Sequence, residues 1–172
     1  FREGLETEIH WRITDKVSLN ANGSLSRSKI KEFREFIDDY DQGGQQLTIY
    51  NETDIAFSPN LTAYGNIAYE PNSQLRFELV GRHTGKQYLD NTSSDAKSIK
   101  PYTVADIRLH WSPKIKSLKS LTLSLMAFNV LDELYESNGY TFGYIADGTR
   151  VDENYYYPQA GRNFMLKADI RF

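Results

Sequence analysis

The chain has 172 residues, a formal net charge of −3 and no cysteine, which excludes a disulfide framework or thiolate metal site and gives no indication of a nucleic-acid partner. Charged residues make up 25% of the chain, and no run approaches the roughly 18 consecutive apolar residues of a transmembrane helix. Insertion into a membrane as a helix is therefore excluded.

Seven stretches alternate apolar and polar residues with the period of two that indicates a β-strand. In chain order they cover residues 5–13, 17–26, 61–70, 75–82, 105–111, 121–127 and 164–172. In the last stretch Phe164, Leu166, Ala168, Ile170 and Phe172 form an apolar face, and the chain stops on an aromatic residue. The opposite faces of the stretches carry ions, among them Glu6, Glu8, His10, Arg12, Arg76, Glu78, Arg82, Asp106, Arg108, Lys167, Asp169 and Arg171. The pattern predicts an all-β protein.

Short and long connections alternate between these stretches. Residues 14–16, 71–73 and 112–120 are short turns, whereas residues 28–58, 90–101 and 136–161 are long links. This alternation is typical of a transmembrane antiparallel up-and-down β-barrel, which has turns at one rim and large loops at the other. Trp11, Tyr69, Trp111 and Phe172 fall at the short-turn ends, as an aromatic girdle would. The alternative is a soluble β-sandwich whose core these aromatics cap, although sandwiches usually avoid such long structureless loops.

Three parts of the chain resemble the TonB-dependent receptors. FNVLDELYESNGYTF, residues 128–142, resembles the signature of the family's penultimate strand through Asn129, Asp132 and Tyr135, with Val130 where Leu is usual and Leu131 where Phe is usual. NYYYPQAGRNFMLKADIRF, residues 154–172, resembles the closing strand through Pro158, Gly161 and Arg162, with Ile170 in place of the more usual Tyr before the terminal Phe172. TDIAFSPNLTAYGNIAYEP and GKQYLDNTS are similar to the Bacteroidota version of the barrel.

The resemblance implies that residues 1–172 are the C-terminal portion of a receptor barrel, about the last seven strands of a barrel of about 22. It implies active transport across the outer membrane of a Gram-negative bacterium, of a bulky scarce nutrient such as a ferric siderophore, a glycan or a vitamin. The implied partners are outer-membrane lipid, a plug domain, the TonB complex and the barrel-assembly machinery, which would read the strand ending at Phe172. A surface lipoprotein is a further candidate partner, and no cofactor is implied. We expect the plug and earlier strands on a longer chain.

The candidate substrate-binding residues are aromatics of the link 136–161: Tyr140, Phe142, Tyr144, Tyr155 and Tyr156. Exposed aromatic rings can stack on sugars, aromatic siderophores or peptides. They can equally pack loop on loop, which is the favoured interpretation of the same residues.

A second candidate is the acidic group Asp38, Asp39 and Asp41 before Gly43 and Gly44. Carboxylates on a turn can hold Ca²⁺, but the spacing of an EF-hand loop is missing. A solvated acidic loop is therefore favoured, and we predict no metal site.

Catalytic chemistry is not indicated. The three histidines lie in separate strands without the partners of a catalytic triad or the spacing of a zinc site, so we predict no catalytic residues and no enzyme. Two other functions stay open: a passive porin-like or secretion barrel in the outer membrane, and a soluble β-sandwich binding module.

Overall fold

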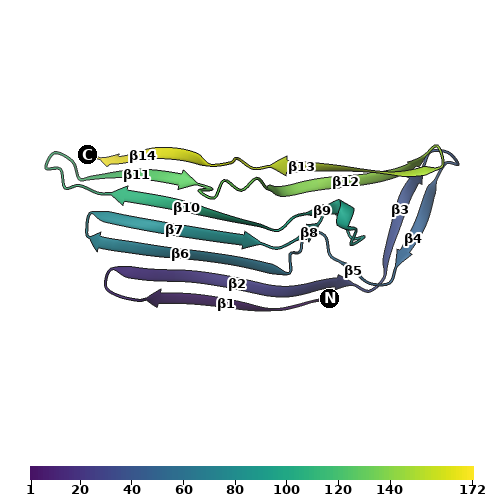
Figure 1. The fold of residues 1–172 in the computed structure, drawn as a ribbon, viewed down its shortest axis with the longest axis horizontal. Helices are drawn as coiled ribbons and strands as arrows, with labels where there is room; N and C mark the ends of the chain where they lie inside the picture. The colour runs from purple at the N-terminus through teal and green to yellow at the C-terminus, as the bar shows by residue number, and fades with distance from the viewer.

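The computed structural model describes all 172 residues, and its main feature is one antiparallel sheet of seven long strands (Figure 1). In spatial order the strands are β1 (Arg2–Arg12), β2 (Val17–Ile30), β6 (Leu61–Asn72), β7 (Leu75–Thr84), β10 (Tyr102–Trp111), β11 (Ser120–Phe128) and β14 (Asn163–Arg171). The two-residue strand β5 (Thr53–Asp54) pairs with the end of β2. All seven predicted strands are confirmed, in the predicted up-and-down order.

The register of the sheet aligns the apolar positions of all seven strands. One row of paired residues runs across the sheet through Trp11, Leu19, Ile67, Leu79, Ile107, Ala127 and Phe164. Directly paired residues of antiparallel strands point to the same side of a sheet. The sheet therefore has one continuous apolar side and one polar side.

Burial on the two sides is the reverse of that in a water-soluble protein. On the apolar side Leu79 is 48% exposed, whereas on the polar side Asp106 is 0% exposed. The buried hydrophobic residues of the wall, Ala68, Val80 and Val104, all lie on the polar side. No second layer covers the apolar side, so these residues do not form the β-sandwich that the pattern alone left open. This pattern is that of a barrel wall with lipid outside and polar groups inside.

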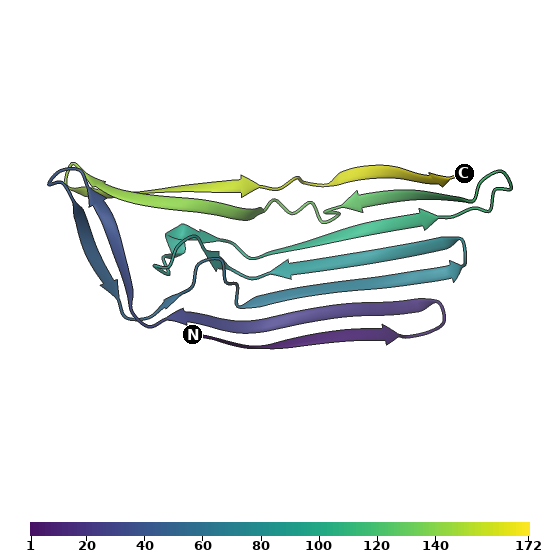
Figure 2. The same ribbon diagram turned by 180° about the vertical axis from the view of Figure 1, so that it is seen from behind.

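The two ends of the sheet differ, as Figures 1 and 2 show. The short turns and Phe172 lie at one end, hereafter the turn end, and the long links lie at the other, the loop end. Thr14 Oγ1 closes the first turn by accepting hydrogen bonds from Lys16 N and Val17 N. Trp11, Tyr69, Trp111 and Phe172 are all exposed at the turn end, as expected for a girdle.

Strand β6 extends further than the sequence predicts. Pro71 and Asn72 belong to the strand rather than to a turn at 71–73. The register shifts between Tyr69 and Asn72, which lets the strand accommodate a proline that cannot donate to the ladder. Asn72 Oδ1 then accepts hydrogen bonds from Gln74 N and Leu75 N to form the turn.

The prediction that the long links are loops without regular structure is wrong. They contain β3 (Phe33–Asp39), β4 (Gln45–Tyr50), the 3₁₀ helix η1 (Asp95–Lys97), β9 (Ser98–Ile99), β12 (Glu136–Ala146) and β13 (Thr149–Pro158), and β8 (Gln87–Tyr88), just before the second link, pairs with β9. Four of these strands form a second sheet in the order β13-β12-β3-β4. The links are rich in aromatic residues that favour strands, and their hairpins find partners in one another. No helix of the structure is long and apolar enough to cross a membrane.

Candidate functional site at the loop end

A junction connects the wall to the β12–β13 hairpin, and it is built on Asn129. This residue is buried and has a φ of 50°. Its Nδ2 donates to Glu133 O at 2.9 Å and to Ala160 O at 3.1 Å, and its Oδ1 accepts from Glu133 N at 3.0 Å. Its own backbone N–H donates to the buried Asp106 of the wall. Asparagine suits this position because it tolerates a positive φ and carries both a donor and an acceptor.

Other residues of the two family-like stretches, 128–142 and 154–172, complete the junction. Asp132 Oδ1 accepts a hydrogen bond of 2.8 Å from Arg162 N, and a Cβ on Gly161 would lie 3.0 Å from the same oxygen. Tyr135 stacks on Tyr102 of the wall at 4.4 Å between ring centroids. The motif therefore fixes the point where the chain leaves the wall and returns to it.

Pro158, Ile170 and Phe172 lie away from these junction contacts. Pro158 is the last residue of β13. Ile170 pairs with Leu121, and both Ile170 and Phe172 are exposed on the edge strand at the turn end. Recognition of the strand that ends at Phe172 by the barrel-assembly machinery stays a prediction.

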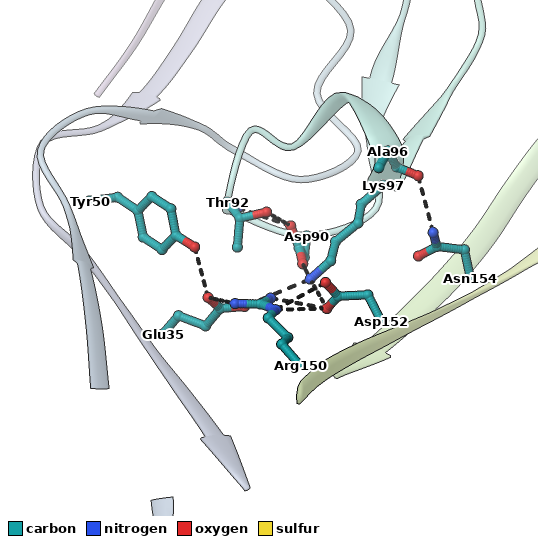
Figure 3. A network of polar contacts seen from close by, with 9 residues as sticks. All are labelled: Glu35, Tyr50, Asp90, Thr92, Ala96, Lys97, Arg150, Asp152 and Asn154. Carbon is teal, nitrogen blue, oxygen red and sulfur yellow. Dashed lines mark hydrogen bonds and ion pairs between the residues drawn. The ribbon is translucent and has the colours of Figure 1, made fainter. Parts of the chain in front are cut away.

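An ionic cluster joins all three long links above the wall (Figure 3). The cluster consists of Glu35 from β3, Asp90 and Lys97 from the segment between β7 and β10, and Arg150 and Asp152 from β13. Lys97 Nζ lies 2.8 Å from Asp152 Oδ1, 3.1 Å from Asp90 Oδ2 and 3.8 Å from Glu35 Oε1. Its side chain is only 4% exposed. A buried cation is tolerated here because three carboxylates surround it.

Arg150 is the second cation of the ionic cluster. It donates two hydrogen bonds to Glu35, at 2.8 and 3.0 Å, and it also pairs with Asp152. Paired bonds from the planar guanidinium fix both distance and orientation. Tyr50 of β4 donates a further hydrogen bond of 2.8 Å to Glu35. The ionic cluster therefore fixes the three links relative to one another.

The pKa values of the cluster follow from these contacts. Burial by itself would raise the pKa of Glu35 and Asp152, but the hydrogen bonds from Arg150, from Tyr50 to Glu35 and from Lys97 to Asp152, together with the charges of Arg150 and Lys97, outweigh it, so both pKa values lie below their usual range. Burial would lower the pKa of Lys97, but its bonds to Asp152 and Asp90 outweigh that effect and raise it. All three groups are therefore held in their charged forms.

The acidic group considered as a Ca²⁺ site binds protein donors instead. Asp39 accepts hydrogen bonds from the backbone of Asp41 and Gln42. Asp41 reaches across to the tip of the β12–β13 hairpin, where its two oxygens accept from Asp147 N at 2.9 Å and Gly148 N at 2.8 Å. The structure shows no group of acidic or histidine side chains arranged to hold a metal ion. The carboxylates join the tips of two hairpins.

Four of the five candidate substrate-binding aromatics lie together on one face of the β12–β13 hairpin. Tyr140 stacks on its cross-strand partner Tyr155 at 5.0 Å, and Phe142 lies 6.1 Å from Tyr155 and 6.4 Å from Tyr144. Tyr157 joins them at 6.2 Å from Tyr140. These five residues are the aromatic face. Tyr144 also packs on Tyr40 of the β3–β4 hairpin at 5.6 Å between ring centroids, whereas the other four rings stay about half exposed.

Tyr156 lies on the opposite face of the hairpin, with Asp152 and Asn154. Its hydroxyl donates to Ser98 O at 3.3 Å, and Asn154 Nδ2 donates to Ala96 O at 3.0 Å. This face is covered by the segment 87–99. Gly139 lies on the same face, where a Cβ would lie 3.0 Å from the Leu89 side chain. The sequence alone does not separate Tyr156 from the other aromatics, because the two faces become distinct only when β12 and β13 pair as a hairpin.

The covered face of the hairpin points toward the polar side of the wall. The segment 87–99 is bonded to residues 55–60, since Phe57 N donates to Tyr88 O and Ala56 N donates to Asn91 Oδ1. Ser26, on the polar side of β2, donates to Pro59 O. Both segments therefore lie over the polar side, and the aromatic face points the other way.

A polar hollow of about 640 Å³ lies beneath these segments on the same side. Its lining is rich in hydroxyl groups, includes Arg2 and Glu6, and has Phe57 as its one hydrophobic residue. Further toward the middle of the wall, Arg82 pairs with the buried Asp106 at 2.9 Å. Hydroxyls and ions in a hollow of this kind can hydrogen-bond a polar solute.

Comparison with known proteins identifies the family. The family described as "TonB dependent receptor-like, beta-barrel" matches residues 2–130, which is most of the chain. The chain belongs to the TonB-dependent receptors. Members of this family are outer-membrane proteins of Gram-negative bacteria, and that is the location of this receptor barrel. The comparison with curated proteins finds no match.

Solved structures of TonB-dependent receptors share the fold. The siderophore receptor PiuA from Acinetobacter baumannii superposes with a TM-score of 0.73 at 20% identity, over 99% of this chain and 21% of that one. The ferric-catecholate import receptor Fiu from E. coli gives 0.64 at 18% identity, over 99% and 21%. The ferric yersiniabactin uptake receptor FyuA from Yersinia pestis gives 0.63 at 18% identity, over 99% and 23%. The chain thus spans about a fifth of the length of these receptors.

The ionic cluster is the part of this receptor barrel that sequence reasoning missed. Glu35 and Arg150 are 115 positions apart, and no local spacing joins them. One signal was available: Arg150, Asp152 and Asn154 alternate with Val151, Glu153 and Tyr155. In a strand, Arg150, Asp152 and Asn154 would share one face.

Proposed function

We propose that this chain forms the C-terminal part of the barrel of an outer-membrane receptor that imports a ferric siderophore with energy from TonB. The observation that carries the proposal is the wall itself, with its continuous exposed apolar side and its polar side lined by ions and hydroxyls. Such a wall suits lipid on one side and a wet interior on the other. Membership of the TonB-dependent receptors favours active over passive transport.

The substrate proposal rests on the receptors with a similar fold, which are named for siderophore or ferric-siderophore uptake. The polar hollow near Arg2 and Phe57 is the surface we assign to the substrate path, because it lies on the inner side beneath the links. Glycan or vitamin import has no comparable support, and the Bacteroidota resemblance stays a prediction.

The remaining parts of the receptor would close the barrel and fill it. Strands β1 and β14 are the two edges of the sheet, and unpaired backbone groups in lipid cost several kcal/mol each, so further strands must pair with both edges. A plug domain would lie against the polar side of the wall. The turn end would then face the periplasm and the loop end the cell exterior. The barrel-assembly machinery and a surface lipoprotein stay proposed partners.

The test is uptake of iron-55 bound to candidate siderophores by cells that express the intact receptor. We expect accumulation in a host with TonB and none in an otherwise identical host that lacks TonB, or after the proton gradient is collapsed. Uptake that continues without TonB would instead support the passive porin-like barrel. Substitution of Arg2 and Phe57 by Ala should lower uptake at low substrate concentration, whereas Leu47→Ala on the outside of the β4 strand should not.

A further inference from the structure

The turn between β10 and β11, residues 112–120, carries positive charge that no neighbouring acidic residue balances. Lys114, Lys116 and Lys119 are all exposed, and residues 107–131 contain no aspartate or glutamate. The ion pairs near the turn end are formed by other residues: Arg12 with Asp15, Arg76 with Glu70, and Lys167 with Asp169. The charges of the other two turns are thus neutralised, whereas those of the β10–β11 turn are available to a partner.

The same turn surrounds a hollow of about 400 Å³ that combines charge with apolar surface. The three lysines line it together with three hydrophobic residues, Ile115, Leu118 and Leu121. The rest of the lining is proline and residues with hydroxyl groups, and it includes no acidic residue. A ligand that matches this lining has an anionic group and an apolar part.

The hollow is continuous with the lipid-facing side of the wall. Leu121 lies on the apolar side of β11, where it pairs with the apolar row of β14. Lys119 donates its backbone N–H to Arg171 O, which places it beside the terminal Phe172. Trp111, an exposed residue of the girdle, comes directly before the turn, and Figures 1 and 2 show that this turn extends beyond the other two. Since girdle aromatics lie at the membrane–water interface, the three lysines reach the level of the lipid headgroups.

We propose that this hollow binds the phosphate headgroup of an anionic phospholipid in the leaflet that surrounds the turn end. The lysines attract the phosphate, while Leu121 and Ile115, which is 41% exposed, contact the first carbons of the acyl chains. A soluble phosphate or an acidic peptide would use the lysines but leave the apolar half of the lining in water. The proposal goes beyond import: it requires lipid around the wall but no particular substrate.

The test counts the lipids bound to the intact receptor in detergent by native mass spectrometry. The probes are dioleoyl phosphatidylglycerol, which is anionic, and dioleoyl phosphatidylcholine, which has the same chains and no net charge. We expect the wild-type receptor to bind the first at least about tenfold more tightly, because a lysine cluster favours an anionic headgroup. Equal affinities for the two lipids would overturn the proposal.

Two sets of variants locate the binding site. The triple variant Lys114→Gln, Lys116→Gln and Lys119→Gln should lose the preference for the anionic lipid. The matched control removes the same charge from exposed positions at the loop end, with Lys31→Gln, Lys86→Gln and Lys100→Gln, and should keep the preference. Loss of the preference in both variants would mean that overall charge rather than the hollow attracts the lipid, and would overturn the proposal.

Competition on the wild-type receptor separates the lipid from other anions. We expect neither glycerol phosphate nor hexaglutamate to displace phosphatidylglycerol at equal concentration. Displacement by glycerol phosphate would overturn the proposal in favour of a soluble phosphate ligand, and displacement by hexaglutamate in favour of an acidic protein partner. Absence of siderophore uptake in a receptor that prefers the anionic lipid would uphold this proposal and contradict only the import function.

Discussion

The wall and the loop end are both built from strands and turns, but different interactions hold the strands of each region together. In the wall, neighbouring strands pair through continuous ladders, such as the eleven residue pairs between β1 and β2, and the apolar side chains are left outside. At the loop end, strands from distant parts of the sequence share only short ladders, such as the two residue pairs between β12 and β3, and side-chain contacts, above all the ionic cluster, join the rest. The wall therefore depends on its lipid solvent, and the loop end depends on charge.

This difference means that exposure has opposite meanings in the two regions. Leu79 in the wall is 48% exposed and Leu47 in β4 is 49% exposed, yet we assign lipid to the first and water to the second. A leucine exposed to lipid contributes as a buried one does in a soluble protein. A leucine exposed to water contributes little.

The most direct test of this comparison is to place the same charge at Leu79 and at Leu47. In the intact receptor, Leu79→Arg should lower the free energy of unfolding in lipid vesicles by roughly 2–4 kcal/mol, the cost of a cation on the lipid face near the midplane. Leu47→Arg, the matched control, should stay within about 0.5 kcal/mol of wild type, as surface substitutions usually do. Urea titration in vesicles measures both values. Equal losses would mean that Leu79 does not face lipid.

The second prediction removes the central charge of the loop end. Lys97→Met should leave Glu35, Asp90 and Asp152 with Arg150 as their only cation, and the loss of hydrogen bonds to charged groups should cost about 1.5–3 kcal/mol. We expect backbone hydrogen exchange in residues 33–39 and 87–99 to become at least tenfold faster, with exchange in the wall unchanged. Hydrogen-exchange mass spectrometry of the intact receptor measures this.

The control for that substitution lies on the same segment. Lys86 pairs with Asp95, and its side chain is 39% exposed, so Lys86→Met should cost at most about 1 kcal/mol. If both variants speed exchange equally, the buried ion pairs of Lys97 stabilise the links no more than the exposed ion pair of Lys86 does. If Lys97→Met leaves exchange unchanged, the other contacts between the links, such as those of Arg150 with Glu35 and of Asn154 with Ala96, hold them without Lys97.

The same division explains how much could be predicted from the sequence. The wall could be predicted because each strand alternates apolar and polar residues, so Leu75, Phe77 and Leu79 identify both the strand and its outer face. The loop end could not, because contacts such as Glu35 with Arg150 join positions whose relation depends on the folded path of three links. Asn129 illustrates an intermediate case: the resemblance identified the residue, but only the structure shows that it holds Glu133 and Ala160 in place.

The candidate aromatics show the limit most clearly. The sequence identified Tyr140, Phe142, Tyr144, Tyr155 and Tyr156 as an exposed set, and their substrate contact stays a prediction. Which way they point depends on pairing within the β12–β13 hairpin, where Tyr140 faces Tyr155 and Gly139 faces Tyr156. Without that register, Tyr156 cannot be told apart from the four aromatics of the opposite face.

The last prediction uses pH to separate the two regions. The lowered pKa values of Glu35 and Asp152 stabilise the loop end above their unfolded-state values of about 4, and this contribution is lost as pH falls through the folded-state values. The raised pKa of Lys97 stabilises it below about 10.4, and this contribution is lost as pH rises through the folded-state value. The links should therefore stay fixed from about pH 5 to 10 and loosen on both sides.

Distances between spin labels can test this window, since the chain contains no cysteine. Labels at L47C and K100C, both exposed positions, report the distance between β4 and the segment before β10. We expect one narrow distance distribution at pH 7 and broader ones near pH 3 and pH 11. A control pair in the wall should keep its distribution throughout, because backbone ladders hold it. Broadening already at pH 6 would contradict the argument, because the pKa values of Glu35 and Asp152 are lowered rather than raised.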